Sequence, residues 1–409
     1  MPLIGENYGS YASIEKSEAQ AGVSTETNLY FFGSCPSGEV GKVYYITSYA
    51  DAASKLGITD GGGVDYTLAQ AAVAAFQIVG ISHAYFIPLS NTAAYDASWV
   101  GDAADESGVY VYNRILRESP GVVNLLCAPG VTNGSFLQAM LGLCKNLDGI
   151  KSYCVYDLPC SASDINEQTG FPDPSYIVAN KNISSEYASA VWGTLETSGG
   201  DIISGAAVRS CLLAKADAEY NAPARVGGYL PVENVVGMAY EEEDQETHEM
   251  VNVSIDLRKS EADVLSANGI NSFFNLYSQF ISYGDHTSAF SNGTVVDERG
   301  RWESCIRLLA MFANWFILQF AFIIDEPMTL QLRNDILAAC QKMLNGMVAI
   351  GAVIGEPSVE FIPAENPVNN IARGEFVFSI KMTTPAVVKV LKAKVRYSEA
   401  GLSVYQIAA

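Results

Sequence analysis

Hydrophobic and polar residues recur at two spacings along this chain, and the spacing separates strand-like from helix-like segments. Short apolar runs predict strands at 28–33, 42–47, 84–89, 122–128 and 150–158. Apolar residues three and four positions apart predict helices over 68–79, ending near Gly80, and over 135–147. Strands that alternate with helices in this way predict a sheet with helices packed on it.

The last third of the chain has a different pattern. A long apolar stretch predicts a helix over 301–324 that is buried on all sides, because its two amides would be unsatisfied in lipid and the stretch is short for a membrane span. A second helix is predicted to start at Asp325 to Pro327, where Asp can cap and Pro can occupy the first turn. Strands are then predicted at 358–362 and 374–382.

Other regions carry weaker signals. Between 157 and 239 the periodicity is poor, and the acidic run 241–249 is interpreted as a solvated loop. The terminal segments 8–14 and 402–407 alternate like strands but have no neighbouring strand in the sequence, so each is expected to pair with a distant segment.

Composition restricts the classes of function. The 409 residues are enough for two or three domains, and 49% hydrophobic with 17% charged residues describes a folded protein. The formal net charge of −21 repels phosphate backbones and anionic lipid surfaces, which excludes nucleic acid and membranes as expected partners. No secretory signal is recognised at the start of the sequence, so assembly in the cytoplasm is expected.

The sequence shows no catalytic or metal-binding pattern. The eight cysteines form no CxxC pair and are interpreted as reduced thiols. His83, His248 and His286 are isolated from one another, and Gly61 to Gly63 lack the Lys-Ser/Thr of a phosphate-binding loop. We therefore expect no enzyme activity, no cofactor and no metal.

Two short segments, SANGIN (266–271) and YGDHTSA (283–289), resemble signatures of the contractile phage tail sheath family. The ending 361–397 resembles the last part of that family more specifically, and 28–57 and 204–231 resemble it more loosely. His286 stands where the family usually has Arg, and Tyr283 where it has Trp. The matching positions are Asn268, Gly269, Ile270, Asn271, Gly284, Thr287, Asn366 and Gly374.

The resemblance implies a multi-domain α+β or α/β protein. In such a protein the N- and C-terminal segments build a sheath-type assembly domain and α/β domains are inserted between them. On this basis we expect an N-terminal arm at 1–27, inserted outer α/β domains at 28–255, the assembly domain facing the tube at 256–397 and a C-terminal arm at 398–409.

The resemblance also implies that each arm adds a strand to the sheet of a neighbouring subunit, which fits the unpaired strand-like termini. Hinges are expected at Gly22 and near 398–401. The arm residues expected to make these contacts are Tyr8, Tyr11, Ile14, Leu402, Val404, Tyr405 and Ile407.

Charge near the C terminus is opposite in sign to that of the whole chain. The window 373–396 has a net charge of about +5. It is either a solvated basic face or, as the family's inward-facing helix implies, a ring of positive charge against an acidic tube. The expected tube-facing residues are Lys381, Lys389, Lys392, Lys394 and Arg396.

The function implied by the resemblance is structural. The chain is expected to polymerise as stacked six-fold rings, a helical homo-oligomer, around a tail tube protein, to meet baseplate and tail terminator proteins at its ends, and to contract as part of a virion tail. Two alternatives stay open: the sheath of a tailocin, secretion-type or extracellular contractile injection system, and an α/β enzyme that uses Asp157 or Asp217 at a strand end.

Overall fold

The computed structural model describes residues 25–59, 65–146, 149–225, 227–244, 246–277, 279–291, 298–389 and 391–400. The predicted arm residues lie outside the described residues; they are Tyr8, Tyr11, Ile14, Leu402, Val404, Tyr405 and Ile407, and the predicted hinges at Gly22 and Gly401 do as well.

An eight-stranded sheet forms the centre of the main body, in the order β12-β11-β6-β5-β4-β1-β3-β2. The inner strands from β3 to β11 run parallel, and the edge strands β2 and β12 are antiparallel. Buried parallel strands explain the near-continuous apolar runs in the sequence. The strands are β1 (Thr27–Ser34), β2 (Tyr44–Ile46), β3 (Ala84–Ser90), β4 (Val123–Cys127), β5 (Tyr153–Asp157), β6 (Ala188–Val191), β11 (Ile270–Leu276) and β12 (Gln279–Tyr283).

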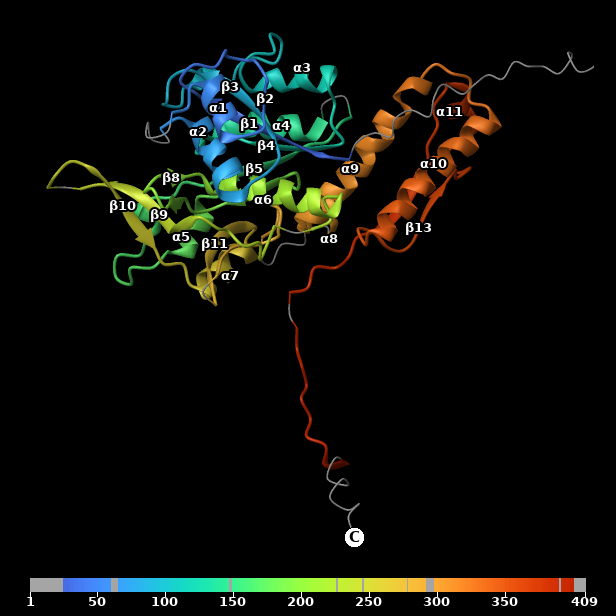
Figure 1. Ribbon diagram of the computed structural model, residues 1–409. Coiled ribbons are helices and arrows are strands. Elements are labelled where there is room, and N and C mark those ends of the chain that lie inside the picture. Colours follow the sequence, from blue (N-terminus) through green and yellow to red (C-terminus); the bar gives the residue numbers. More distant parts are fainter. Residues whose placement is uncertain are drawn as a thin grey trace, which may run out of the picture.

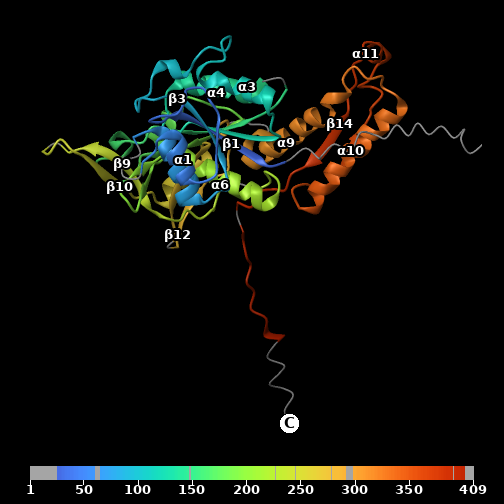
Figure 2. The same ribbon diagram turned by 45° about the horizontal axis from the view of Figure 1, so that its top comes forward.

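Helices cover both faces of this sheet, with α3 and α4 on one side and α1 and α6 on the other (Figures 1 and 2). They are α1 (Tyr49–Leu56), α2 (Thr67–Ala72), α3 (Val111–Glu118), α4 (Gly134–Asn146), α5 (Pro174–Ala179), α6 (Gly205–Tyr220) and α7 (Lys259–Ala267). Helix α2 continues as a π-helical segment, Val73–Val79, that ends at Gly80 in a left-handed conformation. Short 3₁₀ turns lie at Ala97–Trp99, Gly108–Tyr110, Ala162–Asp164 and Ala321–Ile323.

Helix α6 was not predicted, although it packs against the middle of the sheet. Ser204 starts it by accepting a hydrogen bond from the backbone N–H of Ala207 at 3.0 Å. Its apolar and polar residues, including Arg209 and Asp217, are buried together. A helix buried on most of its surface shows no apolar stripe, so the periodicity test misses it.

A smaller sheet of four antiparallel strands, in the order β10-β9-β7-β8, lies at one end of the body. Its strands are β7 (Leu195–Thr197), β8 (Ile202–Ile203), β9 (Val235–Glu243) and β10 (Met250–Ile255). The β9–β10 hairpin projects away from the body (Figure 1). The predicted acidic loop at 241–249 is therefore wrong in part: Glu241 to Glu243 belong to β9, and the chain turns only after them.

A separate lobe follows, with its own hydrophobic core (Figure 1). Helix α9 extends from the body into this lobe, where Leu344 of α10 and Val359 of β13 contribute to the core. Strands β13 and β14 pair antiparallel and form a sheet of only two strands. The elements are α8 (Glu298–Arg301), α9 (Glu303–Phe320), α10 (Leu330–Ala349), β13 (Ile354–Glu360), α11 (Val368–Ala372) and β14 (Ser379–Thr383).

Two expectations for the long apolar stretch are corrected. The stretch is not buried on all sides, because Phe322 is 77% and Ile324 is 73% exposed after α9 has ended. Helix α10 is capped by Thr329, which accepts from the N–H of Leu332 at 3.0 Å, so Asp325 to Pro327 lie in the turn before it.

By length and composition, one helix among the described residues, Glu303–Ile323, could cross a membrane. In the structure 39% of that window is buried inside the protein. A helix that packs into a protein core meets the same criteria, so the stretch is weak evidence for a span.

The mixed α/β class predicted from the sequence is confirmed. The expected boundary at 255/256 falls between β10 and α7, and both sides of it supply strands to the eight-stranded sheet. After β14 the chain returns to the body and then leaves it as an extended segment that ends far from both the body and the lobe (Figures 1 and 2).

Candidate functional site: the junction that anchors the C-terminal segment

The two sequence signatures meet in space, although twelve or more residues separate them in the chain. Asn271 lies on β11 and is fully buried. Its side-chain amide donates to the carbonyl of Ala190 on β6 at 3.2 Å and to that of His286 at 3.4 Å. A side chain at Gly284 would overlap Asn271, and Gly284 has a φ of +101°. Asn271 and Gly284 therefore fix how the segment after β12 packs on the sheet.

The turn before β11 is equally restricted. Gly269 has a φ of +71°, and a Cβ there would lie 2.5 Å from the carbonyl of Phe290 and 2.7 Å from that of Thr287. Thr287 is buried, and its hydroxyl donates to the carbonyl of Gly300 just before α9. Ile270 is fully buried in β11. The two signatures thus form one packed unit at the start of α9.

Lys181 holds this unit together from a third segment. Its ammonium donates to the carbonyl oxygens of Asn268, Ser288 and Phe290, at 3.1 Å for the last two. Burial lowers the pKa of Lys181 to about 8. Sequence reasoning missed this lysine, because a side chain that binds backbone carbonyls requires no particular residue type at the other end.

His286 lies in an aromatic stack inside the junction. Its ring centroid is 4.1 Å from that of Phe290 and 4.8 Å from that of Trp302, both nearly parallel to it. Arg301 approaches the His286 Nε2 atom with its Nε at 3.3 Å, and Ser266 lies 3.4 Å from Nδ1. Burial, followed by nearby Lys389 and Arg301, lowers the pKa of His286 to about 3. The ring is therefore neutral and accepts from Arg301.

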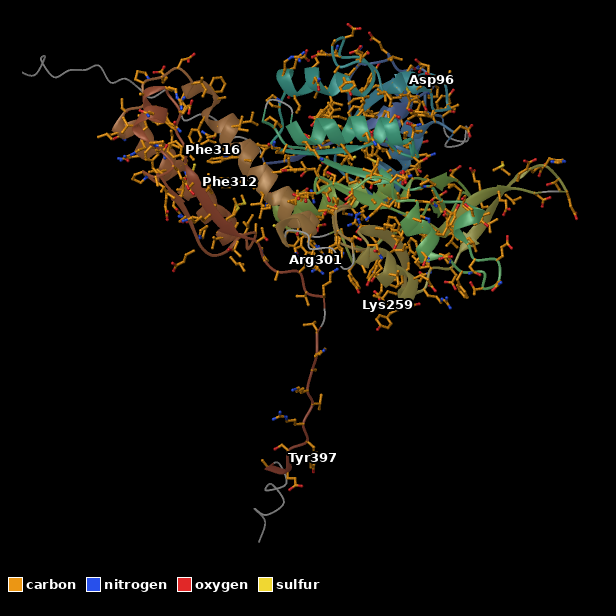
Figure 3. The ribbon with its side chains drawn as sticks, turned by 180° about the vertical axis from the view of Figure 1, so that it is seen from behind. Asp96, Lys259, Arg301, Phe312, Phe316 and Tyr397 are labelled. Atoms are coloured by element: carbon orange, nitrogen blue, oxygen red, sulfur yellow. The ribbon has the colours of Figure 1, made fainter. Side chains whose placement is uncertain are left out.

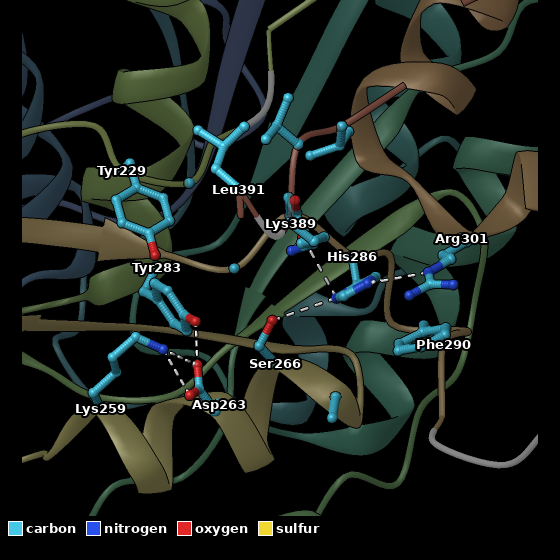
Figure 4. A pocket seen from close by; sticks show the side chains of 16 residues that line it. Tyr229, Lys259, Asp263, Ser266, Tyr283, His286, Phe290, Arg301, Lys389 and Leu391 are labelled. Atoms are coloured by element: carbon cyan, nitrogen blue, oxygen red, sulfur yellow. Dashed lines mark hydrogen bonds and ion pairs between the residues drawn. The ribbon is translucent and has the colours of Figure 1, made fainter. Parts of the chain in front are cut away.

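Asp285 connects the junction to the C-terminal segment. It is 4% exposed, and its carboxylate forms an ion pair with Lys389 (Figure 4). Burial raises the pKa of Asp285, and the Lys389 ammonium opposes that rise. The ammonium also lies 5.3 Å from the ring centroid of Trp302. Lys389 is thus the point at which the extended segment is fixed to the body.

An open cavity of about 610 Å³ lies beside this ion pair. Tyr283 and Asp263 line one side of it, where the tyrosine hydroxyl donates to the carboxylate and Lys259 pairs with the same carboxylate at 2.7 Å (Figure 4). Leu391 lines the other side and is 88% exposed. The cavity is the space between the body and the first residues of the departing segment.

Helix α9 is tied to the body by two buried ion pairs with α6. Glu303 pairs with Arg209 at 2.6 Å, and all four side-chain surfaces of this pair and of Arg307 with Asp217 are 2% exposed or less. Thr27 at the start of β1 donates to Asp217 at 2.8 Å. Because α9 continues into the lobe, these pairs set the orientation of the lobe relative to the sheet.

Asn314, two turns further along α9, makes the third attachment. Its amide nitrogen donates to the carbonyls of Val122 at 2.8 Å and Lys151 at 2.7 Å, and its oxygen accepts from the N–H of Lys151 at 2.6 Å. This amide, polar within an apolar helix, thus satisfies backbone groups at the edge of the body.

Asp157 and Asp217, considered above for an enzyme, both have structural partners. Asp157, at the end of β5, accepts from Ser204 at 2.5 Å and from the N–H groups of Ala206 and Gly130 at 2.8 Å. Asp217 lies within α6 and not at a strand end, so that part of the alternative is wrong. Both carboxylates are buried and engaged. Among the described residues, no group of His, Cys, Asp or Glu could hold a metal ion.

The remaining predicted residues lie away from the junction. Asn366 is buried in the lobe and holds the loop between β13 and β14, through bonds to Ile362 at 3.0 Å and Val377 at 2.9 Å. Gly374, with a φ of +82°, follows α11. Lys381 on β14 pairs with Glu360 at 3.4 Å. The other predicted cations, Lys392, Lys394 and Arg396, are exposed on the extended segment.

Solved structures share this architecture. The sheath complex of the extracellular contractile injection system PVC, in its contracted state, matches with a TM-score of 0.69 at 12% identity, covering 92% of this chain and 93% of that chain. A chain of the anti-feeding prophage baseplate matches with a TM-score of 0.66 at 16% identity, covering 94% and 97%. A sheath tail protein from Desulfitobacterium hafniense matches with a TM-score of 0.55 at 15% identity, covering 90% and 99%.

No family model matches the sequence, and no curated protein matches it. At these identities the likeness shows the fold: the chain has the fold of contractile-sheath subunits. The resemblance inferred from the short signatures is confirmed at that level. The proteins that share the fold are sheath components and not enzymes.

Proposed function

We propose that this chain is the structural subunit of a contractile sheath. It polymerises as stacked six-fold rings around a tail tube and shortens to drive that tube through a target envelope. The observation that carries the proposal is the sheath-type fold over more than nine tenths of the chain, combined with an extended C-terminal segment that has left its own body.

The lobe supplies a place where neighbouring chains attach. A sheet of two strands leaves one side of β13 and one side of β14 without a strand partner among the described residues. Exposed backbone donors and acceptors on such edges bind an extended segment with little demand on its side chains. In the proposed sheath, the N-terminal arm (1–27) and the C-terminal arm (398–409) come from adjoining copies, with hinges at Gly22 and near 398–401.

The segments between the arms have different tasks in this proposal. Residues 28–255 form the outer part of the sheath, and residues 256–397 face the tube and carry the assembly contacts. The buried attachments of α9 fit this division, because they connect the two parts through one continuous helix.

Contraction in this proposal needs no cofactor or nucleotide. The extended sheath is a kinetically trapped state, and contraction adds burial and charge pairing between subunits. The proposed partners are further copies of the chain, a tail tube protein, and baseplate and tail terminator proteins at the two ends. Nucleic acid and membranes are not among them. The proposed location is a virion tail or related particle, assembled in the cytoplasm of the producing cell.

A second candidate within the same class is an extracellular contractile injection system. It is favoured by TM-scores of 0.66 to 0.69 with PVC and anti-feeding prophage chains, against 0.55 and 0.53 with two sheath tail proteins. Native particles isolated from the producing cells separate the candidates. A DNA-filled head on the sheath identifies a phage, whereas headless particles identify a tailocin or an injection system.

The experiment that tests the proposal is deletion of the arms. Removal of residues 1–14 or 399–409 is expected to leave folded monomers, judged by circular dichroism, that no longer form tubes in negative-stain images. Sheaths of normal appearance from either deletion would refute the assignment of the arms.

A further inference from the structure

Residues 391–397 have the side-chain pattern of a strand with two unlike faces. Leu391, Ala393, Val395 and Tyr397 alternate with Lys392, Lys394 and Arg396. Successive side chains of a strand point to opposite sides, so an extended backbone places the apolar residues on one face and the cations on the other. In the structure this segment is extended and belongs to no sheet.

The apolar face of this segment is uncovered in the single chain. Leu391 is 88%, Val395 95% and Tyr397 80% exposed. Figure 3 shows Tyr397 far out on the segment, at a distance from Phe312 and Phe316 on α9. The Lys389–Asp285 ion pair fixes the start of the segment to the body, and from there it runs away from the lobe of its own chain (Figures 1 and 4). A second molecule must therefore cover this face.

Strand β13 offers an edge of matching character. Glu356 and Glu360 on it are exposed. Val359 is opposite Ile380 of β14, and both pack against the core of the lobe. A strand added beside β13 thus finds acidic residues along its path and an apolar surface beneath it.

The other candidate surfaces fit the segment less well. Strand β14 carries Lys381, which repels further cations. An acidic tube surface would attract the cationic face, as the sequence pattern alone predicts, but it would leave the apolar face of Leu391, Val395 and Tyr397 in water. Only a sheet edge with an apolar surface beneath it satisfies the backbone and both faces together.

We infer that residues 391–397 of one copy add as a strand to the β13 edge of a second copy, with Lys392, Lys394 and Arg396 beside its Glu356 and Glu360. The inference rests on the proposed sheath function and specifies the partner surface. Pro357 lacks an N–H, and its carbonyl already accepts from Gln341 at 3.1 Å, so the pairing is centred on Ser358 to Glu360.

The test is charge reversal in the full-length chain, without tube protein. The variants K392E/K394E/R396E and E356K/E360K are each expected to reduce pelletable cylinders at least tenfold, and the variant that combines both sets is expected to recover most of them. E326K, an exposed reversal in the turn before α10, is the matched control and assembles normally. Circular dichroism verifies that every variant is folded.

A binding measurement keeps the inference testable apart from assembly. A fluorescent peptide of residues 389–400 is expected to bind the full-length chain by anisotropy, at least tenfold more weakly to E356K/E360K, and again to that variant when the peptide carries the three glutamates. Peptide binding that ignores both reversals overturns the inference.

The outcomes separate the inference from the proposed function. If K392E/K394E/R396E forms normal cylinders and loses only its co-assembly with tube protein, the cations face the tube and the inference is wrong. If the unmodified chain forms no cylinders while the peptide follows the charge pattern, the proposed function fails and the binding surface stands.

Discussion

Replacing Arg307 by Met removes one half of a buried ion pair and leaves Asp217 in the protein interior. The side chains of Arg307 and Asp217 are 1% and 2% exposed. A buried carboxylate without its counter-ion is strongly destabilising, and breaking pairs of this kind has an effect of about 3–5 kcal/mol. We expect R307M to lose about that much free energy of unfolding.

The structure also predicts how the loss is recovered. Among the described residues, Asp217 Oδ1 and the Nε and Nη1 atoms of Arg307 have no hydrogen-bond partner. The intact pair is therefore incompletely satisfied, and its net contribution is small compared with the effect of breaking it. The double variant R307M/D217N keeps an acceptor for the Thr27 hydroxyl and is expected to recover most of the loss.

The pH dependence of R307M follows from the pKa of Asp217. Burial raises that pKa already, and Arg307 opposes the rise. Without Arg307 the folded-state pKa is higher still, so the variant's stability is greatest at low pH and decreases as pH rises through that pKa. The difference in stability from the unmodified chain is therefore expected to be smaller at pH 4 than at pH 7.

The assay is urea unfolding followed by tryptophan fluorescence, since Trp302 and Trp315 lie next to and within α9. The control is K215M, a change on the same helix α6 at a side chain outside the ion pairs. A loss below about 1 kcal/mol in R307M, or a double variant as unstable as the single one, would refute the reasoning.

Three further predictions concern the junction and α9. H286F removes a group whose pKa falls from 6.5 to about 3 on folding, so the stability lost by the unmodified chain as pH falls from 6.5 toward 3 is expected to shrink in the variant; equal slopes in acid unfolding curves contradict this. K389M leaves Asp285 without its counter-ion and frees the segment, so trypsin is expected to cleave after Lys392 faster, and an unchanged cleavage rate shows that Lys389 is no anchor. N314L removes three hydrogen bonds and leaves backbone groups unpaired, an expected loss of about 3 kcal/mol in the same urea assay, and a loss under about 1 kcal/mol contradicts the proposed attachment.

The strands of the main sheet could be predicted because each carries its own signal. Strand β1 was predicted at 28–33 and spans Thr27–Ser34, and β3 was predicted at 84–89 and spans Ala84–Ser90. Local apolar runs are sufficient for such elements. They do not give the strand order, because pairing depends on contacts between distant segments.

The elements that were missed lack a local signal of this kind. Helix α6 is buried on most of its surface, so its sequence shows no stripe. Strand β9 continues into Glu241 to Glu243, where charged residues of an exposed hairpin look like a loop. The single-chain pattern predicted the long helix but not that its last residues, such as Phe322, are exposed.

The junction was predictable only in part. The two signatures identified Asn271 and Gly284, but not that they contact each other. Lys181 binds backbone carbonyls, and the partners Asp217 and Arg307 lie 90 positions apart. Nothing in a single sequence relates residues at such separations, since the relation exists only after the sheet has formed.

The central claim is that this chain works as a lattice whose terminal segments are borrowed by adjoining copies. Electron microscopy of the purified full-length protein over a range of concentrations, with helical reconstruction, tests it most directly. The account predicts hollow cylinders in which residues 391–397 of one subunit lie beside the β13–β14 sheet of another. Compact monomers at every concentration, with the C-terminal segment folded onto their own body, would contradict it.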